Sequence, residues 1–343
     1  MTYAMPSDTT TTSHDQPLLS ASNIVVEYPS RGGQRVSAVA GVSFDLRHGE
    51  TIGVVGESGC GKSSLGRAVM QLPRPTSGSV VFAGADLTQQ RGRSLRRARV
   101  QMQMVFQDPI SSLNPKRSVQ DILLEALAVA GPASLSRQTD RLDAVHNILA
   151  EVGLDPVAAA SRRPHEFSGG QCQRICIARA LILAPRLMIC DEPVSALDVS
   201  VQAQILNLLQ DLKAKYSLSL LFISHDLAVV KHIADRVMVM YLGKVCELAP
   251  ADDMYRRPQH PYSDLLLQSV AVPDPSVPIS PTSIGGDLPS PLNPPSGCRF
   301  RTRCPFASAV CAEREPELRE TSPGHFVACH HPLDPVRPVG PST

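Results

Sequence analysis

The chain has little net charge and contains no long apolar run. Its 33 Lys and Arg residues are nearly balanced by 32 Asp and Glu residues, so the charge gives no sign of the basic surface typical of nucleic-acid-binding proteins. No stretch approaches the roughly 20 apolar residues of a membrane-spanning helix, and Met1 to Pro17 is polar and Thr-rich, unlike a signal peptide. We therefore expect no nucleic-acid partner, and a protein that works in the cytosol or on a membrane surface.

The sequence also has no internal repeat, and most of its nine cysteines are scattered. With 343 residues, 43% of them hydrophobic, the chain can bury a large core. Isolated thiols are typical of a reducing compartment, where small buried cysteines stay free. The scattered set is Cys60, Cys172, Cys176, Cys190 and Cys246. The other four cysteines lie close together near the C-terminus.

From Leu18 to about Leu248 short β-branched apolar runs alternate with helical stretches, the pattern of a layered α/β domain. Between about residues 107 and 180 apolar positions recur at spacings of three and four, which predicts an inserted helical subdomain. The clearest expected strands are 51–55, 187–190, 220–223 and 237–241.

Both ends of the chain differ from this domain. Residues 1–17 are expected to form a flexible tail. Beyond residue 248 an extension runs to residue 343, and Pro273 to Pro295 carries eight prolines, too many for a helix or a central strand. We expect an irregular extension with a linker or strap and a mobile terminus.

The stretch from Gly56 to Ser63 matches the phosphate-loop pattern G-x-x-x-x-G-K-S/T between an expected strand and an expected helix. In such a loop, backbone amides surround the β-phosphate. Lys62 would neutralise the β- and γ-oxygens, and Ser63 would give its hydroxyl to Mg²⁺. The residues assigned to ATP here are Gly56, Glu57, Ser58, Gly59, Cys60, Gly61, Lys62, Ser63 and Ser64.

Polar residues follow two of the expected strands, where open α/β sheets bind ligands. Asp191 would hold Mg²⁺, and Glu192 would orient or deprotonate the attacking water. His225 could donate a hydrogen bond to the γ-phosphate or to that water. Gln107 offers an amide oxygen to the metal or the water. Taken singly, a histidine after a strand is more often structural, so these assignments depend on the phosphate loop.

A second glycine-rich turn, Ser168-Gly169-Gly170-Gln171, also enters an expected helix. Helix starts offer unpaired N–H groups and the positive end of the helix dipole to an anion. One nucleotide does not need two such turns, so the second requires another explanation.

Together these motifs resemble the ATP-binding subunit of an ABC transporter, with a RecA-like core sheet. The phosphate loop is similar to Walker A, 187–192 to Walker B, Gln107 to the Q-loop, Ser195–Asp198 to the D-loop and His225 to the switch histidine. In this family subunits dimerise head to tail, and Ser168–Gln171 would cap the ATP of the other subunit. The resemblance also implies that Tyr28 stacks on adenine. ATP and Mg²⁺ are the implied cofactors.

Segments outside these motifs are similar to the dipeptide, oligopeptide and nickel importer group. They are Arg163–Phe167, Val194–Ser200 and Arg257–Ser263. This implies a peptide-import ATPase at the cytoplasmic face of the membrane, with a second, different ATPase subunit, two permease subunits and an extracytoplasmic binding protein. A nickel or other solute importer, or a soluble ABC-type ATPase acting on nucleic acid or protein complexes, is the alternative.

Four cysteines, Cys298, Cys304, Cys311 and Cys329, could converge on one metal. Four sulfurs suit an iron–sulfur cluster or zinc, although the close cysteine pair of most zinc sites is missing, and His325, His330 or His331 would have to substitute. Resemblance to importer ATPases implies a 4Fe–4S cluster, with Zn²⁺ or free thiols as alternatives. Arg299, Arg301 and Arg303 would favour the thiolates.

Overall fold

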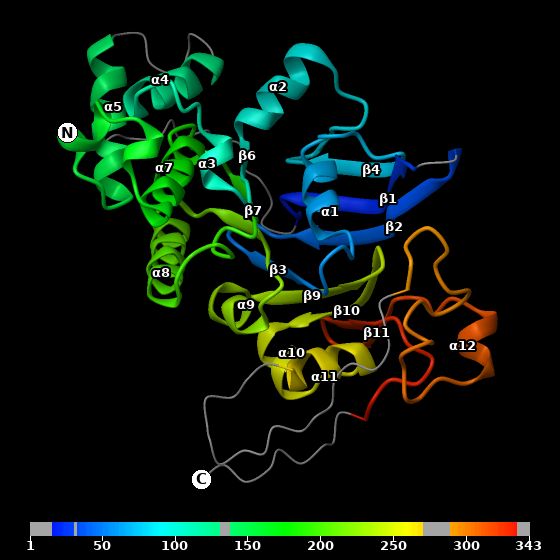
Figure 1. The fold of residues 1–343 in the computed structure, drawn as a ribbon. Helices are drawn as coiled ribbons and strands as arrows, with labels where there is room; N and C mark the ends of the chain where they lie inside the picture. The colour runs from blue at the N-terminus through cyan, green and yellow to red at the C-terminus, as the bar shows by residue number, and fades with distance from the viewer. Residues whose placement is uncertain (1–15, 31–32, 131–137, 270–288, 335–343) are drawn as a thin grey trace, which may run out of the picture.

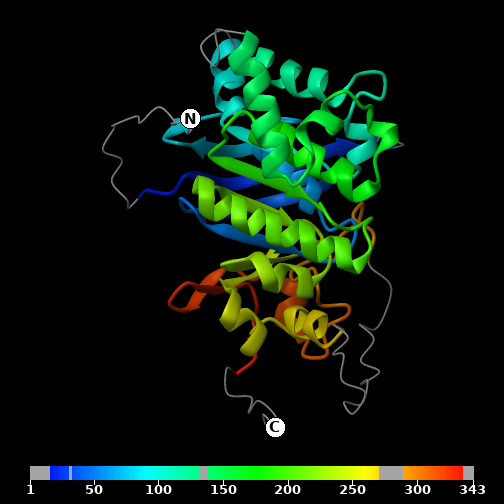
Figure 2. The same cartoon turned by 90° about the vertical axis from the view of Figure 1, so that its left-hand side faces the viewer.

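The computed structural model describes residues 16–30, 33–130, 138–269 and 289–334 (Figure 1). Viewed from the side, a helical part, a layer of sheets and the C-terminal extension follow one another along the long direction of the molecule (Figure 2). Of the expected N-terminal tail, residues 1–15 lie outside the described residues, as do the proline-rich stretch up to residue 288 and the terminus beyond residue 334.

An eight-stranded sheet forms the centre, in the order β11-β12-β10-β9-β3-β8-β7-β6. In chain order, its first six strands are β3 (Thr51–Val55), β6 (Met102–Val105), β7 (Leu187–Asp191), β8 (Ser219–Ile223), β9 (Arg236–Tyr241) and β10 (Lys244–Pro250). The pairs β6/β7, β7/β8, β8/β3 and β3/β9 are parallel. Their continuous apolar runs are buried because both faces of a parallel sheet are covered. The strands predicted from those runs are confirmed.

A smaller antiparallel sheet has the order β2-β1-β4-β5. It comprises β1 (Leu19–Pro29), β2 (Arg35–Leu46), β4 (Ser77–Phe82) and β5 (Ala85–Asp86). Its inner residues share a buried core with α1 (Lys62–Val69) and β3. The helix α2 (Gly92–Val100) then leads into β6.

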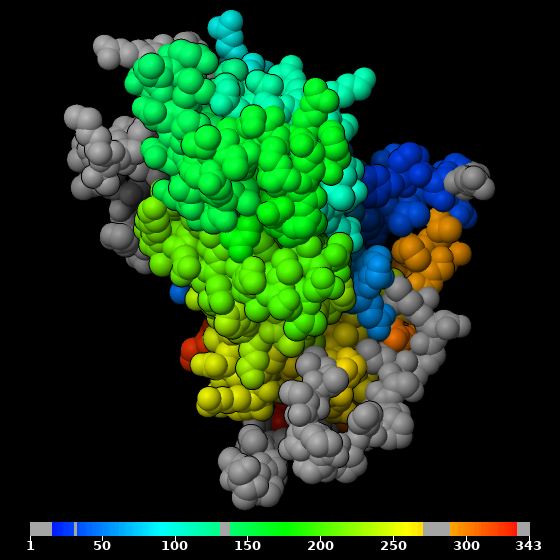
Figure 3. Space-filling model, turned by 60° about the vertical axis from the view of Figure 1, so that its left-hand side comes forward, coloured from blue at the N-terminus to red at the C-terminus, as the bar shows by residue number. Residues whose placement is uncertain are grey.

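The helical part occupies the stretch where the sequence predicts an insertion. It contains α3 (Pro109–Ser112), α4 (Val119–Ala130), α5 (Gln138–Glu151), α6 (Pro156–Ala160), a 3₁₀ turn (Pro164–Glu166) and α7 (Gly169–Leu181). Two further helices, α8 (Val199–Tyr216) and α9 (Leu227–Ile233), follow β7 and β8. The space-filling view shows the helical part, in green, above the yellow α10 and α11 of the extension (Figure 3).

The extension is joined to the central sheet. After α10 (Ala251–Arg256) and α11 (Pro261–Gln268), the chain returns through α12 (Ala309–Glu313), β11 (Arg319–Ser322) and β12 (His325–Val327). β12 pairs antiparallel with β10, so β12 and β11 extend the sheet at one edge. The predicted boundary at residue 248 therefore falls within β10, a strand that continues to Pro250.

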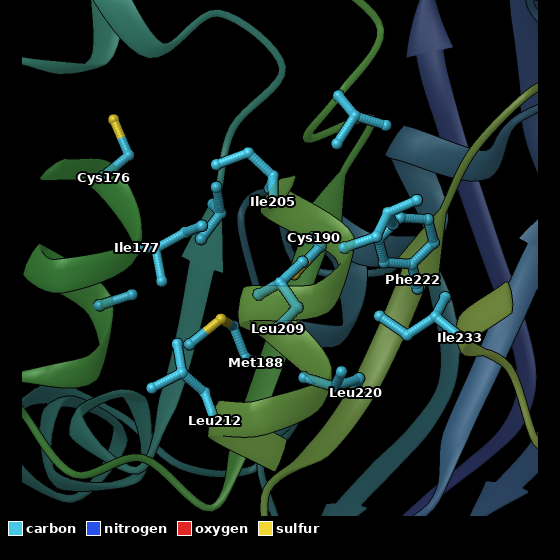
Figure 4. Packing of buried hydrophobic residues seen from close by; sticks show 14 of the residues in the cluster. Cys176, Ile177, Met188, Cys190, Ile205, Leu209, Leu212, Leu220, Phe222 and Ile233 are labelled. Atoms are coloured by element: carbon cyan, nitrogen blue, oxygen red, sulfur yellow. The ribbon is translucent and has the colours of Figure 1, made fainter. Parts of the chain in front are cut away.

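Apolar side chains of α8 pack onto the central strands (Figure 4). Ile205 and Leu209 lie in the same buried cluster as Met188, Leu220 and Phe222. Burying one such side chain contributes about 1.5–3 kcal/mol to the free energy of folding. This packing stabilises the strands whose ends carry the polar residues of the site. Among the described residues, no helix is long and apolar enough to cross a membrane.

Candidate nucleotide site

A cavity of 420 Å³ opens where β3, β7 and β8 end. Its lining includes most of the residues that the sequence assigns to ATP, together with one that it missed. The lining residues are Ala38, Ser58, Gly59, Gly61, Lys62, Ser63, Ser64, Gln107, Glu192 and His225. The structure thus brings together residues from the phosphate loop, the end of β6 and two other strand ends.

The phosphate loop is fixed from behind by backbone. Gly61 adopts φ +105°, and a Cβ there would lie 2.0 Å from the carbonyl oxygen of Ala38, so only glycine fits. Behind the loop, the Gly243 N–H donates to the Cys60 carbonyl at 2.8 Å. Lys62 is buried, and its Nζ donates to the carbonyl of Gly56 at 2.7 Å and of Glu57 at 3.0 Å.

Ser63 and Asp191 meet beside this loop. The Ser63 hydroxyl donates to Asp191 Oδ1 at 2.6 Å. Asp191 Oδ2 is buried with no hydrogen-bond partner, and the nearest cation is Arg67 at 3.7 Å. Burial raises the pKa of Asp191, while Ser63, Arg67 and Lys62 oppose that shift. A hydroxyl beside a carboxylate with an unsatisfied oxygen fits the oxygen preference of Mg²⁺.

Glu192 faces the loop and is held by two partners. Its Oε2 accepts from Gln107 Nε2 at 3.1 Å and lies 3.3 Å from His225 Nδ1. Glu192 has φ +49°, a left-handed conformation that costs a non-glycine residue about 1 kcal/mol. That turn directs the next carboxylate after the buried Asp191 into the cavity. The Glu192 carboxylate, the Gln107 amide and the His225 ring therefore meet at one side of the cavity.

Several predicted ATP residues do not line this cavity. Gly56, Glu57 and Cys60 lie at the back of the loop, where burial raises the pKa of the Cys60 thiol. Tyr28 packs partly against the core beneath the antiparallel sheet. Ala38 could not be found from the sequence, because its contribution is a backbone carbonyl at the loop.

The second glycine turn lies outside the cavity and is capped by its own side chains. Ser168 Oγ accepts from the Gln171 N–H at 3.3 Å, and Gln171 Oε1 accepts from the Ser168 N–H at 3.0 Å. This reciprocal capping box fixes the start of α7. Ser168 and Gly169 are exposed, so this helix start faces outward.

The four tail cysteines gather but are not arranged as metal ligands. Burial, and to a lesser extent the nearby Cys298, Cys304 and Cys311, raises the pKa of Cys329 to about 12. The buried Cys246, which the sequence placed with the scattered thiols, is also close enough to Cys298 for that neighbour to help raise its pKa. Within the described ranges, no group of three or more His, Cys, Asp or Glu side chains is positioned to hold a metal ion.

The arginines expected beside these thiols bond elsewhere. Arg303 pairs with Glu57, Arg301 donates to the Ser296 carbonyl and Arg299 donates to the Leu242 carbonyl. The expectation that they offset the negative charge of a cluster stays a prediction.

Comparison with known proteins agrees with this geometry. Residues 39–195 match the family model "ABC transporter", and residues 246–311 match "Oligopeptide/dipeptide transporter, C-terminal region". The oligopeptide transport ATP-binding protein AppF of Bacillus subtilis is 49% identical over 93% of this chain and 99% of its own length. The chain belongs to the ABC transporter ATP-binding family.

Other members of this ABC family give the same result. OppF of Salmonella typhimurium, an oligopeptide transport ATP-binding protein, is 54% identical over 86% of this chain and 87% of its length. A putative peptide import ATP-binding protein of Brucella ovis is 49% identical over 92% and 98%. The dimeric ATP-binding cassette MJ0796, solved with ADP and phosphate, superposes with a TM-score of 0.62 and 25% identity over 68% of this chain and 98% of that one. The predicted ABC ATPase fold is confirmed.

Proposed function

We propose that the chain is the ATP-hydrolysing motor subunit of an ABC importer for di- and oligopeptides. The observation that carries the ATPase assignment is the position of Glu192. Its carboxylate, bound to Gln107 and His225, faces the phosphate loop across one cavity. The match of residues 246–311 and the names of the relatives support peptides over nickel or a nucleic-acid-linked activity.

In this proposal the phosphate loop binds ATP through its backbone amides. Lys62 would exchange its present carbonyl partners for β- and γ-phosphate oxygens. Ser63 and Asp191, with Gln107, would hold Mg²⁺, which neutralises charge on the phosphates. Glu192 would accept a proton from the attacking water, and His225 would stabilise the charge that develops on the γ-phosphate.

The outward-facing Ser168–Gln171 turn is proposed to contact the ATP of a second ATPase subunit. Its exposure and its position outside the lining of the chain's own cavity support this role. Two chains arranged head to tail would each supply half of a site. The ATP between them would stabilise the closed dimer, and hydrolysis would release it. A different ATPase subunit as the second member is part of the proposal.

An apolar groove of 670 Å³ between α2, β6 and α4 supports a permease contact. Its apolar lining includes Leu72, Leu95, Phe106 and Val129, and the residues Leu72 and Val129 are 42% and 45% exposed; Arg96, Arg99 and Arg179 also line it. Exposed apolar patches of this kind mark protein–protein contact. We therefore place the motor at the cytoplasmic face of the inner membrane, with two permeases and an extracytoplasmic binding protein.

A metal at the cysteine segment also remains a proposal. The thiols as placed do not form a ligand set, so no step of ATP hydrolysis depends on it. The gathering of Cys298, Cys304, Cys311 and Cys329 supports a 4Fe–4S cluster, with Zn²⁺ as the alternative. Iron and labile sulfide in anaerobically purified protein would support the cluster, whereas zinc without iron would support the alternative.

Glu192→Gln tests the ATPase assignment. Because the carboxylate is needed for chemistry and not for holding phosphate, hydrolysis should fall by at least about 100-fold while ATP still binds. Steady-state phosphate release and titration with a fluorescent ATP analogue measure the two effects. Glu125→Gln is the matched control, since that carboxylate pairs with Arg117 in the helical part. Unchanged turnover in Glu192→Gln would remove Glu192 from its role.

A further inference from the structure

Two side chains of the C-terminal extension, those of Arg303 and Tyr262, form hydrogen bonds with Glu57 at the back of the phosphate loop. Arg303 donates to both carboxylate oxygens of Glu57, at 2.8 and 2.9 Å. The Arg303 side chain is only 6% exposed, so the pair is largely protected from solvent. The Tyr262 hydroxyl accepts from the Glu57 N–H at 3.0 Å. One loop residue is thus held through its side chain and through its backbone.

These contacts lead directly to the phosphate-binding lysine. The carbonyl of the same Glu57 accepts from Lys62 Nζ at 3.0 Å. The Tyr262 contact fixes the N–H of Glu57, and the peptide on its other side presents the carbonyl to Lys62. Bidentate Arg–carboxylate pairs fix orientation as well as distance. The orientation of the loop therefore depends on groups 205 and 246 residues away in the sequence.

Aromatic packing and a buried carboxylate hold Arg303 and Tyr262 in place. Phe300 lies 5.2 Å from the ring of Tyr262 and 5.3 Å from that of Tyr241. The Tyr241 hydroxyl also accepts from Arg303 at 3.3 Å. Ahead of α11, the fully buried Glu247 accepts from the backbone N–H groups of residues 259 and 260. The segment between Cys298 and Cys304 therefore holds Arg303 as part of a packed unit.

We propose that Arg303 and Tyr262 are positioning residues for ATP binding, acting through Glu57 on the phosphate loop. This rests on the ATPase function proposed above and assigns the extension a part in it. The extension would hold the phosphate loop in its binding conformation before ATP arrives. Without the contacts of Arg303 and Tyr262, ATP binding would have to order the loop, which costs free energy. Neither residue touches the cavity.

The proposal predicts a change in KM rather than in kcat. The loop holds the phosphates in the ground state and the transition state alike, and losing such uniform binding raises KM with kcat little changed. We expect Arg303→Gln to raise the KM for ATP, and the dissociation constant of an ATP analogue, by roughly tenfold. A purely structural loss would instead lower the active fraction, and so the apparent kcat, at unchanged KM.

The variants are made in the full chain. Arg303→Lys keeps the charge but not the bidentate geometry, so its KM should lie between wild type and Arg303→Gln. Glu57→Gln should match Arg303→Gln, and the double variant should be no worse than either single one, because both remove the same interaction. Tyr262→Phe should raise KM less, since it removes one neutral acceptor.

Matched control variants distinguish loss of the contacts to Glu57 from a general loss of protein stability. Arg301→Gln removes an arginine of the same segment that bonds only to Ser296 among the contacts described, and it should leave KM unchanged. Tyr216→Phe removes a hydroxyl that bonds Glu151 far from the loop. Equal KM values for wild type, Arg303→Gln and Glu57→Gln, in protein that hydrolyses ATP normally, would overturn the inference alone. A wild-type chain that neither binds nor hydrolyses ATP would overturn the proposed function with it.

Discussion

The two glycine turns of this chain differ in what holds them. The phosphate loop is fixed by distant parts of the molecule: the Ala38 carbonyl beside Gly61, the turn after β9, and the extension through Arg303 and Tyr262. The Ser168 turn is fixed by its own capping box, with Gln171 as the reciprocal partner. Two turns with similar composition therefore have opposite environments.

The difference fits the proposal that the two turns bind ATP in different ways. The supported turn lies in a cavity with Glu192, Gln107 and His225, so its ligand can be held within one chain. The self-capped turn is exposed and has no such surroundings of its own. In the proposed function, the surface of a second subunit would complete this turn around a shared nucleotide.

Replacing one glycine by alanine in each turn is expected to give the largest difference in stability and ATP affinity. In Gly61→Ala the new Cβ would lie 2.0 Å from a backbone oxygen at φ +105°, which should cost about 2–4 kcal/mol of stability and abolish ATP binding. In Gly169→Ala the Cβ would lie 3.5 Å from Leu197 Cδ2, an ordinary contact. Thermal unfolding and ATP-analogue titration compare the two.

Equal stability and equal ATP affinity of the two alanine variants would contradict this contrast. It would mean that the backbone behind the phosphate loop can move aside at little cost. Such a result would also weaken the argument that distant segments preset the loop.

A smaller effect is expected from pH, through the residue that caps the helix carrying Tyr262. His260 Nδ1 accepts from the Tyr262 N–H at 3.0 Å, and burial lowers the pKa of His260 to about 4. Between pH 6.5 and 4 the unfolded chain binds a proton that the folded chain does not, so stability falls as pH decreases through this window. From pH 7.5 to 5 the loss should be about 2 kcal/mol.

His260→Asn should flatten this pH dependence, because an asparagine oxygen can still cap α11 but does not titrate. Thermal unfolding at pH 7.5 and pH 5 measures it in both proteins. The exposed His165, changed to Gln, serves as the control and should keep the wild-type slope. An identical slope in His260→Asn would show that another group carries the acid sensitivity.

Much of the central sheet and the cavity could be predicted from the sequence. The strands at 51–55 and 187–190 are continuous apolar runs, and a strand buried on both faces has that pattern. Lys62, Ser63 and Glu192 follow such strands at fixed short spacings, so local order was enough to bring them to one edge. These features depend on neighbours along the chain.

The sequence did not predict features that depend on distant contacts. β11 and β12 are short, and their place is set by pairing of β12 with β10. Glu57 is assigned to ATP by its place in the motif, yet its side chain points to Arg303. Cys246 looks isolated in the sequence but lies near Cys298. No local pattern encodes which residues meet across 50 or more positions.

One titration tests most directly the claim that one turn binds the chain's own ATP and the other acts on a partner's. A fluorescent ATP analogue is added to the dilute, isolated chain, and affinity is compared for wild type, Lys62→Ala and Ser168→Arg. We predict that Lys62→Ala loses affinity at least about tenfold. Ser168→Arg should bind as wild type while losing ATP hydrolysis in the assembled dimer. If Ser168→Arg weakened binding to the isolated chain as much as Lys62→Ala, the account of two half-sites would be contradicted.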